Sequence, residues 1–413
     1  MKEKIKIIHI MNHPPAYEEY SDKPRPFVNW DTPDGKWVGI WGYDWADQIA
    51  NECLKISSEF EHEVWQPDLR ADKIYSYTFA NGLIHRLFPA VKKENGEIVS
   101  QLMNLFISKE NLMRNKYIFH IAYPHFSGIN RGIIDSYKDQ KFIMTFHSEI
   151  YLPLNYIFKF QKNFFKKVHY IKNHFDAKKY FRYINHITYQ NDKNLKTLAN
   201  YYNGPLTRIT MGVDINKFHK IDKDESRKRL NIPLDKKILL TVSRLNPLKQ
   251  VDKLIDILQK IDYDFLFVLV GHGTREYEQF LKKKAEKLIN ENKIRFEGYK
   301  QSEELIHYYN AADLYLHVSR SEGGSVSVME AMACGLPVFC TDTGNTAEVL
   351  KENNAGVVVG ICDFKMWEDK LFGYFAGSPV KTLDEIIVKR YYAWENIAIK
   401  LVSIYNGLLG LKK

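Results

Sequence analysis

The sequence lacks the features that mark secreted proteins, proteins stabilised by a bound metal, and membrane-spanning proteins. Its four cysteines, Cys53, Cys334, Cys340 and Cys362, form no CxxC pair and no metal-ligand spacing, so we expect reduced and mostly buried thiols. The longest apolar run, Phe265–Val270, is far shorter than the roughly 20 residues that a membrane-spanning helix needs. These absences favour an ordinary reduced globular protein.

The first residues also do not have the pattern of a signal peptide. Met1–His13 carries Lys and Glu ahead of a short apolar run, with no small-residue cleavage pattern after it. We therefore expect a cytoplasmic protein. The segment Phe158–Tyr183 is basic and rich in Phe and Tyr, so we also expect a peripheral position on the inner face of the membrane. A core-packing helix with a solvated basic face, or an RNA contact, are the alternatives; we expect no nucleic-acid partner.

The length of 413 residues predicts two domains, at roughly 100–200 residues per domain. A charged content of 26% and a hydrophobic content of 45% exclude extended disorder. The formal net charge of +9 fits nucleotide-sugars, anionic lipids and nucleic acids alike, so the charge does not choose among them.

In the second half, continuous apolar runs alternate with helix-period segments, which predicts a parallel sheet covered on both faces. The predicted strands are Ile238–Ser243, Phe265–Gly271, Ile294–Gly298, Leu314–Ser319, Pro337–Thr341 and Gly356–Val359. The predicted helices are Val251–Lys260, Arg275–Asn290, Glu303–Ala312, Val326–Cys334 and Thr346–Lys351. Gly212–Lys237 is charged and weakly patterned and fits a connection between domains, whereas Leu383–Leu409 predicts one long amphipathic helix.

The first half alternates less regularly. Its predicted strands are Ile5–Ile10, Glu63–Gln66, Tyr117–Ala122, Phe142–His147, Ile187–Gln190 and Leu206–Met211. Its predicted helices are Trp45–Ser57, Ile98–Asn115 and much of Pro153–Phe181. The stretch Met11–Gly42 holds five prolines and few periodic apolar residues, which predicts a long functional loop.

The densest cluster of functional residue types runs from Ser319 to Val338. Gly323, Gly324 and Ser325 follow a strand and open a helix, where unpaired N–H groups and the positive end of the dipole suit a phosphate. Glu330 lies eight residues after Glu322, and a carboxylate there can accept two hydrogen bonds from a ribose diol. Two plainer interpretations stay open: Ser327-Val-Met-Glu330 is also a capping box, and Glu322 alone fits a solvated loop acid.

The spacing of Glu322 and Glu330, followed by Ala331–Val338 and Thr343–Glu348, resembles the Glu-x7-Glu signature of retaining GT-B glycosyltransferases of family four, the glycosyl transferases group 1. Five further stretches match that family in the correct order: Met211–Phe218, Val242–Lys249, Val270–Gly273, Phe296–Tyr299 and Tyr392–Glu395. The resemblance is close over residues 190–405 and loose before them. Gly324 and Ser325 depart from it, because they replace the usual Phe-Gly.

The resemblance implies an α/β protein with the GT-B fold, in which two Rossmann-like domains face each other across a cleft. We expect an N-terminal acceptor-side domain over residues 1–212 and a nucleotide-sugar-binding domain over 213–388. Residues 389–413 are expected to form a helix that crosses back to the N-terminal domain.

The resemblance also implies which residues bind the donor. Arg244 and Lys249 match its phosphate site, where a planar cation and a point charge would neutralise a departing diphosphate; an ordinary basic loop is the alternative. Glu322, His147, Arg244 and Lys249 are the expected catalytic residues. The expected donor-binding residues are Arg244, Lys249, Gly271, Gly273, Tyr299, Gly323, Gly324, Ser325, Glu330 and Gly42.

His147 is the candidate from the first half, because it ends a predicted strand and ligands bind beyond the carboxyl ends of parallel strands. In the family a histidine at this point touches the donor sugar. A satisfied structural histidine is the alternative, and His120 and His125 are weaker candidates. Gly42 belongs to the Gly39–Asp44 stretch, where the family's Gly-Gly pair is split and aromatic residues intervene.

We expect neither a metal nor a cofactor. Asp222-Lys-Asp224 and Asp262-Tyr-Asp264 have the Asp-x-Asp form that holds a divalent metal in the other large transferase fold. One lies in the expected linker and the other in a helix-to-strand turn, where Asp is common for local reasons.

The expected activity is a hexosyl-type glycosyltransferase that moves a sugar from a nucleotide-sugar to a glycan or lipid-linked hydroxyl with retention of configuration. A sugar-nucleotide epimerase or a phosphorylase of the same fold is an alternative. A catalytically silent protein that binds sugar-nucleotide or glycan is another. The resemblance identifies neither the donor nor the acceptor.

Overall fold

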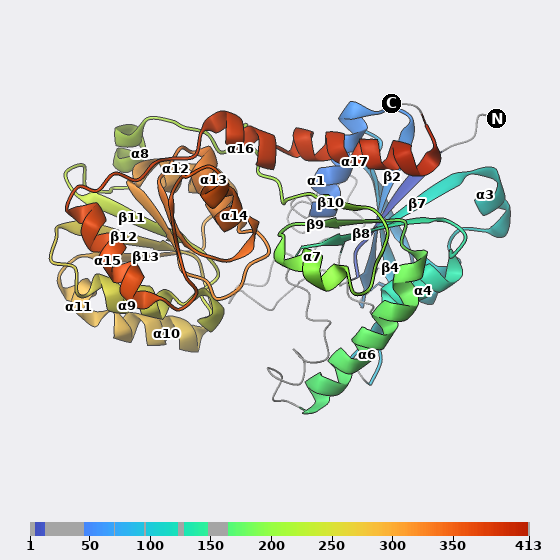
Figure 1. The fold of residues 1–413 in the computed structure, drawn as a ribbon, viewed down its shortest axis with the longest axis horizontal. Helices are drawn as coiled ribbons and strands as arrows, with labels where there is room; N and C mark the ends of the chain where they lie inside the picture. The colour runs from blue at the N-terminus through green and yellow to red at the C-terminus, as the bar shows by residue number, and fades with distance from the viewer. Residues whose placement is uncertain are drawn as a thin grey trace. The chain divides into compact units, whose positions relative to one another are not determined.

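The computed structural model describes residues 5–12, 45–69, 71–94, 96–122, 128–147 and 164–411 (Figure 1). They divide into two compact units. Unit 1 holds the chain up to Thr210 and again from Trp394, and unit 2 holds Met211–Ala393. Apart from Met11 and Asn12, the predicted loop Met11–Gly42 lies outside the described residues.

Unit 1 is built on an eight-stranded sheet in the order β10-β9-β8-β7-β1-β2-β4-β3. Its strands are β1 (Ile5–Ile10), β2 (Phe60–Asp68), β3 (Tyr75–Thr78), β4 (Ile84–Pro89), β7 (Lys116–Ile121), β8 (Lys141–Phe146), β9 (His186–Tyr189) and β10 (Leu206–Arg208). All neighbours pair in parallel except β3, an antiparallel edge strand on β4. The parallel sheet predicted from the alternating pattern is confirmed.

The two faces of this sheet carry different side chains, because successive residues of a strand point to opposite sides. Ile8 and Ile10 of β1 join an apolar cluster with helices α4 and α6, whereas His9 contacts side chains of β2 and β7 on the other side. The helices of unit 1 are α1 (Trp45–Ile56), α2 (Gln101–Leu105), α3 (Lys109–Arg114), α4 (Gly128–Ser136), α6 (Phe164–Tyr180), η1 (Phe181–Tyr183), α7 (Lys193–Leu198) and α17 (Trp394–Leu409). Helix α17 packs along α1, as Figure 1 shows.

Unit 2 is built on a six-stranded parallel sheet in the order β13-β12-β11-β14-β15-β16. Its strands are β11 (Lys237–Val242), β12 (Phe265–Val270), β13 (Ile294–Gly298), β14 (Leu314–His317), β15 (Val338–Thr341) and β16 (Val357–Val359). Its helices are α8 (Lys223–Arg229), η2 (Pro247–Lys249), α9 (Val251–Leu258), α10 (Arg275–Lys284), α11 (Glu286–Asn290), α12 (Ser302–Ala311), α13 (Val326–Ala333), α14 (Gly344–Glu352), α15 (Phe364–Phe375) and α16 (Glu385–Tyr392). All six predicted strands are confirmed within two residues.

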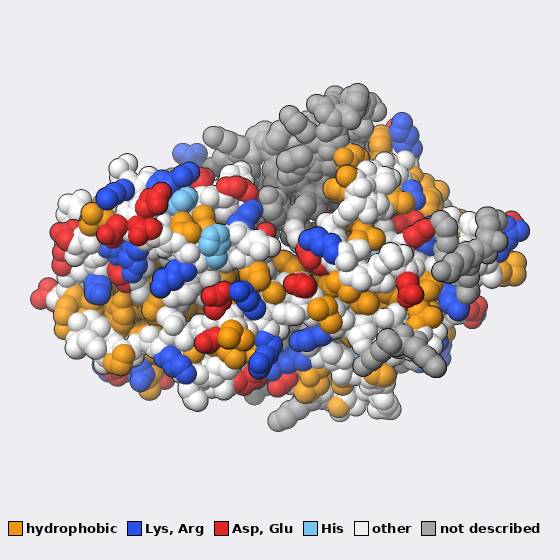
Figure 2. Space-filling model, turned by 90° about the horizontal axis from the view of Figure 1, so that it is seen from above, with side chains coloured by type: hydrophobic (Ala, Val, Ile, Leu, Met, Phe, Trp, Pro, Cys, Tyr) orange, Lys and Arg blue, Asp and Glu red, His pale blue; other side chains and the backbone are white. Residues whose placement is uncertain are grey.

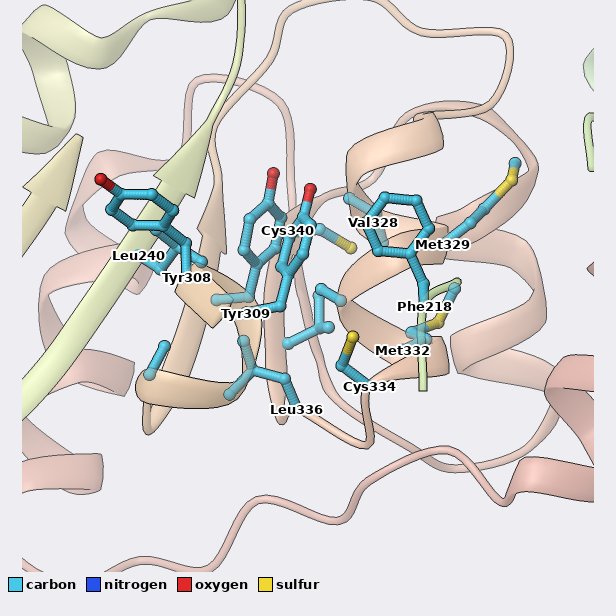
Figure 3. Close-up of a cluster of buried hydrophobic side chains, with 14 of the residues drawn as sticks. Phe218, Leu240, Tyr308, Tyr309, Val328, Met329, Met332, Cys334, Leu336 and Cys340 are labelled. Carbon is cyan, nitrogen blue, oxygen red and sulfur yellow. The ribbon is translucent and has the colours of Figure 1, made fainter. Parts of the chain in front are cut away.

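Helices cover both faces of this sheet, so each face has its own apolar core. Leu239 of β11 joins the core under α9, α10 and α15. Leu240, the next residue, joins the core under α12, α13 and α14, part of which Figure 3 shows with Tyr309 among Phe218, Val328 and Cys340. The strands read as continuous apolar runs because both of their faces are buried.

Several predicted elements are wrong. The single helix predicted over Ile98–Asn115 is a short strand, β6 (Ile98–Val99), paired with β5 (Val91–Lys92), then α2 and α3. Ser100 and Ser108 interrupt it, because each side-chain oxygen caps a new helix start by accepting from Met103 N and Asn111 N. Two elements of unit 1 that the sequence did not predict are strands β3 and β4.

The two segments predicted at the unit boundary also differ. Gly212–Lys237 is not a plain connection, because it contains α8, which packs on α12. The single helix predicted over Leu383–Leu409 is divided at Ala393, whose extended backbone bridges Val213 and separates α16 from α17. The helix that begins at Trp394 belongs to unit 1, so the C-terminal helix crosses back as expected.

Charged side chains are mixed by sign over the face that Figure 2 shows. Lys and Arg lie among Asp and Glu there. In unit 2 as a whole, ion pairs such as Lys284–Asp256 at 2.6 Å and Lys236–Asp264 at 2.9 Å recur. The excess of nine positive charges therefore does not gather into one basic area on that face.

Candidate functional site

The carboxyl ends of parallel strands lie at one edge of a sheet, and the candidate residues of unit 2 follow four such ends. The loop after β11 holds Arg244 and Lys249. Asn246 fixes its geometry by capping η2, with its side-chain oxygen accepting from Leu248 N at 3.0 Å. Gln250 then takes a left-handed conformation with φ of 49° and starts α9.

Gly271 and Gly273 have a structural reason of their own. A Cβ at Gly271, where φ is +138°, would lie 1.8 Å from the carbonyl oxygen of Ser243, and one at Gly273 would lie 2.1 Å from that of Leu245. These contacts accompany backbone bonds from Ser243 N to Val270 O and from Leu245 N to His272 O. The two glycines therefore let the loops after β11 and β12 run side by side, and they need no ligand to explain them.

The loops after β11 and β14 are joined as well. Arg320 N donates to Leu248 O at 2.9 Å, and this bond places the residues on either side of it next to each other. Lys249 Nζ consequently forms an ion pair with Glu322 Oε1. The structure thus brings together two of the predicted catalytic residues, 73 positions apart in the chain.

A third side chain meets the same carboxylate. His317, the last residue of β14, donates from Nε2 to Glu322 Oε1 over 2.9 Å. The side chains are only 4% exposed for His317, 12% for Glu322 and 17% for Lys249, so the cluster is largely removed from water. Burial disfavours ionisation of Glu322, but the bond from His317 and the charge of Lys249 outweigh it and lower the pKa of that carboxyl to about 2.

Glu330 lies in a different environment. It is in the second turn of α13 and accepts a hydrogen bond from the Tyr309 hydroxyl of α12 at 2.6 Å. Burial raises the pKa of its carboxyl to about 7, although the Tyr309 bond and the charge of Lys217 oppose that shift. The capping-box interpretation of Ser327 and Glu330 is wrong, because Ser325 precedes the first residue of the helix.

The glycine turn between them is held by the start of α14. Asn345 N donates to Gly323 O at 2.9 Å, and a Cβ on Gly344, at φ of +68°, would lie 2.8 Å from that same oxygen. Gly324 follows, and Ser325 begins α13, with its hydroxyl 3.1 Å from that of Ser327. The turn is therefore held by a backbone hydrogen bond at Gly323 and by a hydroxyl contact at Ser325.

The other predicted site residues of unit 2 lie on neighbouring loops. Arg244 has an exposed side chain on the Lys249 loop. Tyr299, after β13, is 58% exposed, and its ring meets His272 edge-on at 5.4 Å. Neither residue is in direct contact with the Glu322 carboxylate, whose two partners among the described residues are Lys249 and His317.

In unit 1, His147 follows β8 as predicted. Its Nδ1 lies 2.8 Å from Gln190 Nε2, and Trp45 meets its ring edge-on at 4.9 Å. Burial lowers the pKa of His147 to about 4, so the imidazole is neutral near pH 7. His120 lies wholly inside, bonded to Tyr405 and Thr145, which supports a structural role for it. Gly42 and His125 lie outside the described residues.

Sequence reasoning missed His317 and Tyr309, the partners of the two acidic residues. His317 lies near the end of the predicted strand Leu314–Ser319 and ends the observed strand β14, so the rule that pointed to His147 could have found it. No such signal existed for Tyr309, which lies inside a helix and reaches Glu330 only through the packing of α12 on α13.

No group of three or more His, Cys, Asp or Glu side chains within the described residues has an arrangement that could hold a metal ion. Asp222, the first residue of one Asp-x-Asp sequence, caps α8 by accepting from Glu225 N at 2.7 Å. Of the helices in the described ranges, none combines the length and the apolar character needed to cross a membrane.

Solved structures with this architecture match nearly the whole chain. Sucrose-phosphate synthase from Thermosynechococcus elongatus has a TM-score of 0.68 at 16% identity, covering 99% of this chain and all of that one. Anabaena Alr3699/HepE in complex with UDP has a TM-score of 0.67 at 13% identity, covering 98% of this chain and 100% of that one. The chain therefore has the GT-B fold, as the sequence predicted.

Sequence comparison narrows the class for part of the chain. Residues 222–373 match the model of the family "Glycosyl transferases group 1". A D-inositol 3-phosphate glycosyltransferase from Corynebacterium urealyticum is 30% identical over 219 residues, which are 48% of this chain and 50% of that protein. The chain thus spans about half the length of the curated relatives it matches, and the matched family segment contains Lys249, His317, Glu322 and Glu330.

Proposed function

We propose that the protein is a glycosyltransferase that moves a sugar from a nucleotide-sugar donor to a hydroxyl group of a glycan or lipid-linked acceptor, with retention of configuration. The observation that carries this proposal is the buried contact of Lys249 and His317 with Glu322 at the carboxyl ends of β11 and β14. The family match over residues 222–373 and the UDP held by the Anabaena protein of the same fold support it.

In this proposal the cations of the β11 loop stabilise the diphosphate. Lys249 is held in place by Asn246 and Leu248, and Arg244 stands exposed on the same loop, where a phosphate can reach it. Charge develops on the diphosphate as its bond to the sugar breaks, and fixed cations in a poorly hydrated site stabilise that charge most. No metal is required for this step.

The glycine turn and the two acidic residues bind the rest of the donor. The amides of Gly323, Gly324 and Ser325 bind phosphate and sugar, and Glu322 orients the sugar hydroxyls. Glu330 binds the ribose, and Tyr299 with the Gly271–Gly273 turn lies next to the nucleotide. From unit 1, His147 contacts the sugar and Gly42 contributes to the donor site.

In the proposed retaining reaction no side chain of the protein acts as a nucleophile. The acceptor hydroxyl approaches on the face from which the diphosphate leaves, its oxygen bonds to the anomeric carbon, and its proton passes to the leaving phosphate oxygen. The protein orients the reactants and stabilises charge. In this scheme the transfer of the sugar needs no metal ion, and no cofactor takes part.

The segment Phe158–Tyr183, of which the structure describes the part from Phe164 on, is proposed to rest on an anionic membrane surface. Helix α6 carries Lys178 and Lys179 in its last turn, and Val168 and Phe175 are 51% and 59% exposed. Cations beside exposed apolar side chains suit a headgroup layer. A pelleting assay with liposomes of neutral lipid, with and without added anionic lipid, tests this proposal. An equal bound fraction of protein with and without anionic lipid contradicts it.

The donor is found by a thermal-shift screen with UDP, GDP, ADP and their sugars, since a ligand at 100 times its Kd adds about 2.7 kcal/mol of stability. Transfer and hydrolysis are then measured for Glu322→Ala, Lys249→Ala and Arg244→Ala, with Lys236→Ala as the control for loss of a lysine that pairs with Asp264 elsewhere in unit 2. We expect kcat/KM to fall about 100-fold or more for each site variant.

Three kinds of result would contradict the proposed function. Near-normal activity in all three site variants removes the mechanism. Release of a free epimer, or dependence on inorganic phosphate, identifies an epimerase or a phosphorylase. Donor binding without turnover across a panel of acceptors identifies a silent binding protein.

A further inference from the structure

His317 has a position that the proposed donor site leaves unexplained. It is the last residue of β14, and its ring lies against Tyr315, with ring planes 13° apart and centroids 6.4 Å apart. Tyr315 is fully buried and donates from its hydroxyl to Val242 O, at the end of β11, over 3.0 Å. The imidazole is thus supported by the core of the sheet and not by a loop.

From that position the ring reaches the one carboxylate oxygen that Lys249 also contacts. Both donors end on Glu322 Oε1. Among the described residues, no side chain donates to Glu322 Oε2. Two donors on one oxygen fix the plane of the carboxylate and leave the other oxygen for a ligand, which is the geometry expected for a residue that must bind a sugar hydroxyl.

Lys249 cannot serve Glu322 and a diphosphate equally well. Its ammonium is a single compact charge, and in the proposed function it neutralises phosphate oxygens. When Lys249 turns to the phosphate, a carboxylate that is only 12% exposed loses one of two partners. A buried carboxylate without a partner is costly, so another donor must remain.

We propose that His317 is a positioning residue that keeps the Glu322 carboxylate oriented toward the donor sugar while Lys249 turns to the diphosphate. This inference rests on the proposed function. It requires a hydrogen on Nε2, because that is the nitrogen that contacts Glu322. His317 itself touches neither sugar nor phosphate.

The test compares His317→Gln with His317→Leu in the full chain. The amide nitrogen of Gln can take the place of Nε2, whereas Leu fills similar space without a donor. With the donor found by the screen, we expect His317→Leu to lower kcat about 10–100-fold and to weaken nucleotide-sugar binding. Its Kd for the nucleoside diphosphate alone should change less than about threefold. His317→Gln should recover most of kcat, and His307→Leu, on α12, serves as the control histidine.

A merely structural role gives a different pattern. If His317→Leu loses affinity for the nucleoside diphosphate as strongly as it loses kcat, or if His317→Gln fails to recover activity, the positioning role is overturned. Unchanged kcat in His317→Leu overturns it as well. If His317→Leu does not fold, His317→Gln and the following measurement decide.

The contact can be tested without any activity. In ¹⁵N NMR of the wild-type imidazoles, His317 should carry a hydrogen on Nε2, and the Nε2–H signal should move upfield in Glu322→Gln as the charge-assisted bond weakens. If the chemical shift of the His317 Nε2–H signal is the same in Glu322→Gln as in the wild type, the contact is refuted. Failure of every nucleotide-sugar to bind the wild type refutes the proposed function instead, and leaves the His317–Glu322 contact decided by the NMR result.

Discussion

At the scale of single residues, Gly271 shows how a motif glycine can be required by backbone packing. Its amide donates to Gly298 O, and its Cα faces Ser243 O so closely that no side chain fits. Gly298 also has a positive φ, +67°, but nothing within 4 Å of its missing Cβ. Comparing these two glycines therefore distinguishes the effect of a steric clash from the effect of a strained backbone conformation.

We predict that Gly271→Ala destabilises unit 2 much more than Gly298→Ala does. The second change costs about 1–2 kcal/mol for a left-handed alanine, and the first adds a clash that must move the Ser243 loop and Lys249 with it. Urea unfolding, followed through the amide protection of β11 and β12, measures both. Equal losses for the two variants would show that the loops after β11 and β12 separate easily.

Glu330 differs from its neighbour in what burial does to it. The carboxyl has its pKa raised from 4.5 to about 7, so between these values the folded state keeps a proton that the unfolded state has released. Stability contributed by the protonated form is therefore fully present below pH 4.5 and lost as the pH rises to about 7. Above pH 7 the site holds a buried charge beside Tyr309.

We predict that Glu330→Gln stabilises the protein at pH 8 by on the order of 1–3 kcal/mol and changes little at pH 5. The amide oxygen still accepts from Tyr309. Glu297→Gln is the matched control, since Glu297 accepts from Tyr308 at 2.8 Å but also pairs with Arg295 and Lys300. Urea unfolding at both pH values gives the difference, and equal effects of Glu330→Gln at pH 5 and pH 8 would contradict the raised pKa.

At the scale of elements, strands β1, β2 and β7 carry a buried row of histidines under α1 and α17. His9 lies 3.0 Å from His62 and stacks on it, and His120 bonds to the Tyr405 hydroxyl of α17 at 2.8 Å. Burial lowers the pKa of His62 and of His120 to about 3, and holds the pKa of His9 well below its usual value. The row is therefore neutral and forms part of the packing between sheet and helices.

We predict that this side of unit 1 opens as the pH falls. A histidine with a depressed folded pKa gives stability that is present above its unfolded pKa of 6.5 and is lost toward pH 3, at about 1.4 kcal/mol per pH unit for each histidine. Amide exchange of β1, β7 and α17 should rise between pH 7 and 5, after correction for intrinsic rates, more than that of β12. Parallel behaviour of β1 and β12 would show that the row does not titrate on unfolding.

The hydrogen bond between α17 and the sheet can be tested separately. We predict that Tyr405→Phe costs about 1–3 kcal/mol, because it leaves His120 Nδ1 buried without that partner. Tyr75→Phe, which removes an exposed bond to Asp72, is the control and should cost less than about 0.5 kcal/mol. Denaturant unfolding at pH 7 measures both; a cost for Tyr405→Phe no greater than the control's would mean that His120 finds another partner.

At the scale of the whole molecule, the chain leaves unit 1 after Thr210 and returns at Trp394. Unit 2 is thus contiguous over Met211–Ala393, whereas unit 1 needs α17 to cover α1. Ala393 marks the return, since its extended backbone ends α16 and pairs with Val213.

We predict that residues 211–393 fold alone, whereas residues 1–210 do not unless residues 394–413 are supplied. Without them, the apolar face of α1 is exposed. Circular dichroism and cooperative thermal unfolding of the three products, with the 394–413 peptide added to the second, measure this. Cooperative folding of residues 1–210 without the peptide would show that α17 is dispensable to unit 1.

The sequence alone determined the sheet of unit 2 and the loops of the candidate site. Both faces of the strands in unit 2 are buried, so each strand is a continuous apolar run such as Phe265–Val270, and the polar residues that follow it stand out from the run. This pattern marked the loop that holds Glu322, and the resemblance to the family then singled out Glu322 and Lys249 among the residues that follow the strands.

Only the tertiary structure decided which side chains meet. Lys249 reaches Glu322 through the pairing of β11 with β14, and Tyr309 reaches Glu330 between α12 and α13, across 73 and 21 positions of the chain. Helix breaks have both kinds of cause: Ser100 and Ser108 cap helix starts locally, whereas the extended Ala393 ends α16 where it bridges Val213. Periodicity reports burial, whereas contacts between loops and between helices depend on neighbours distant in sequence.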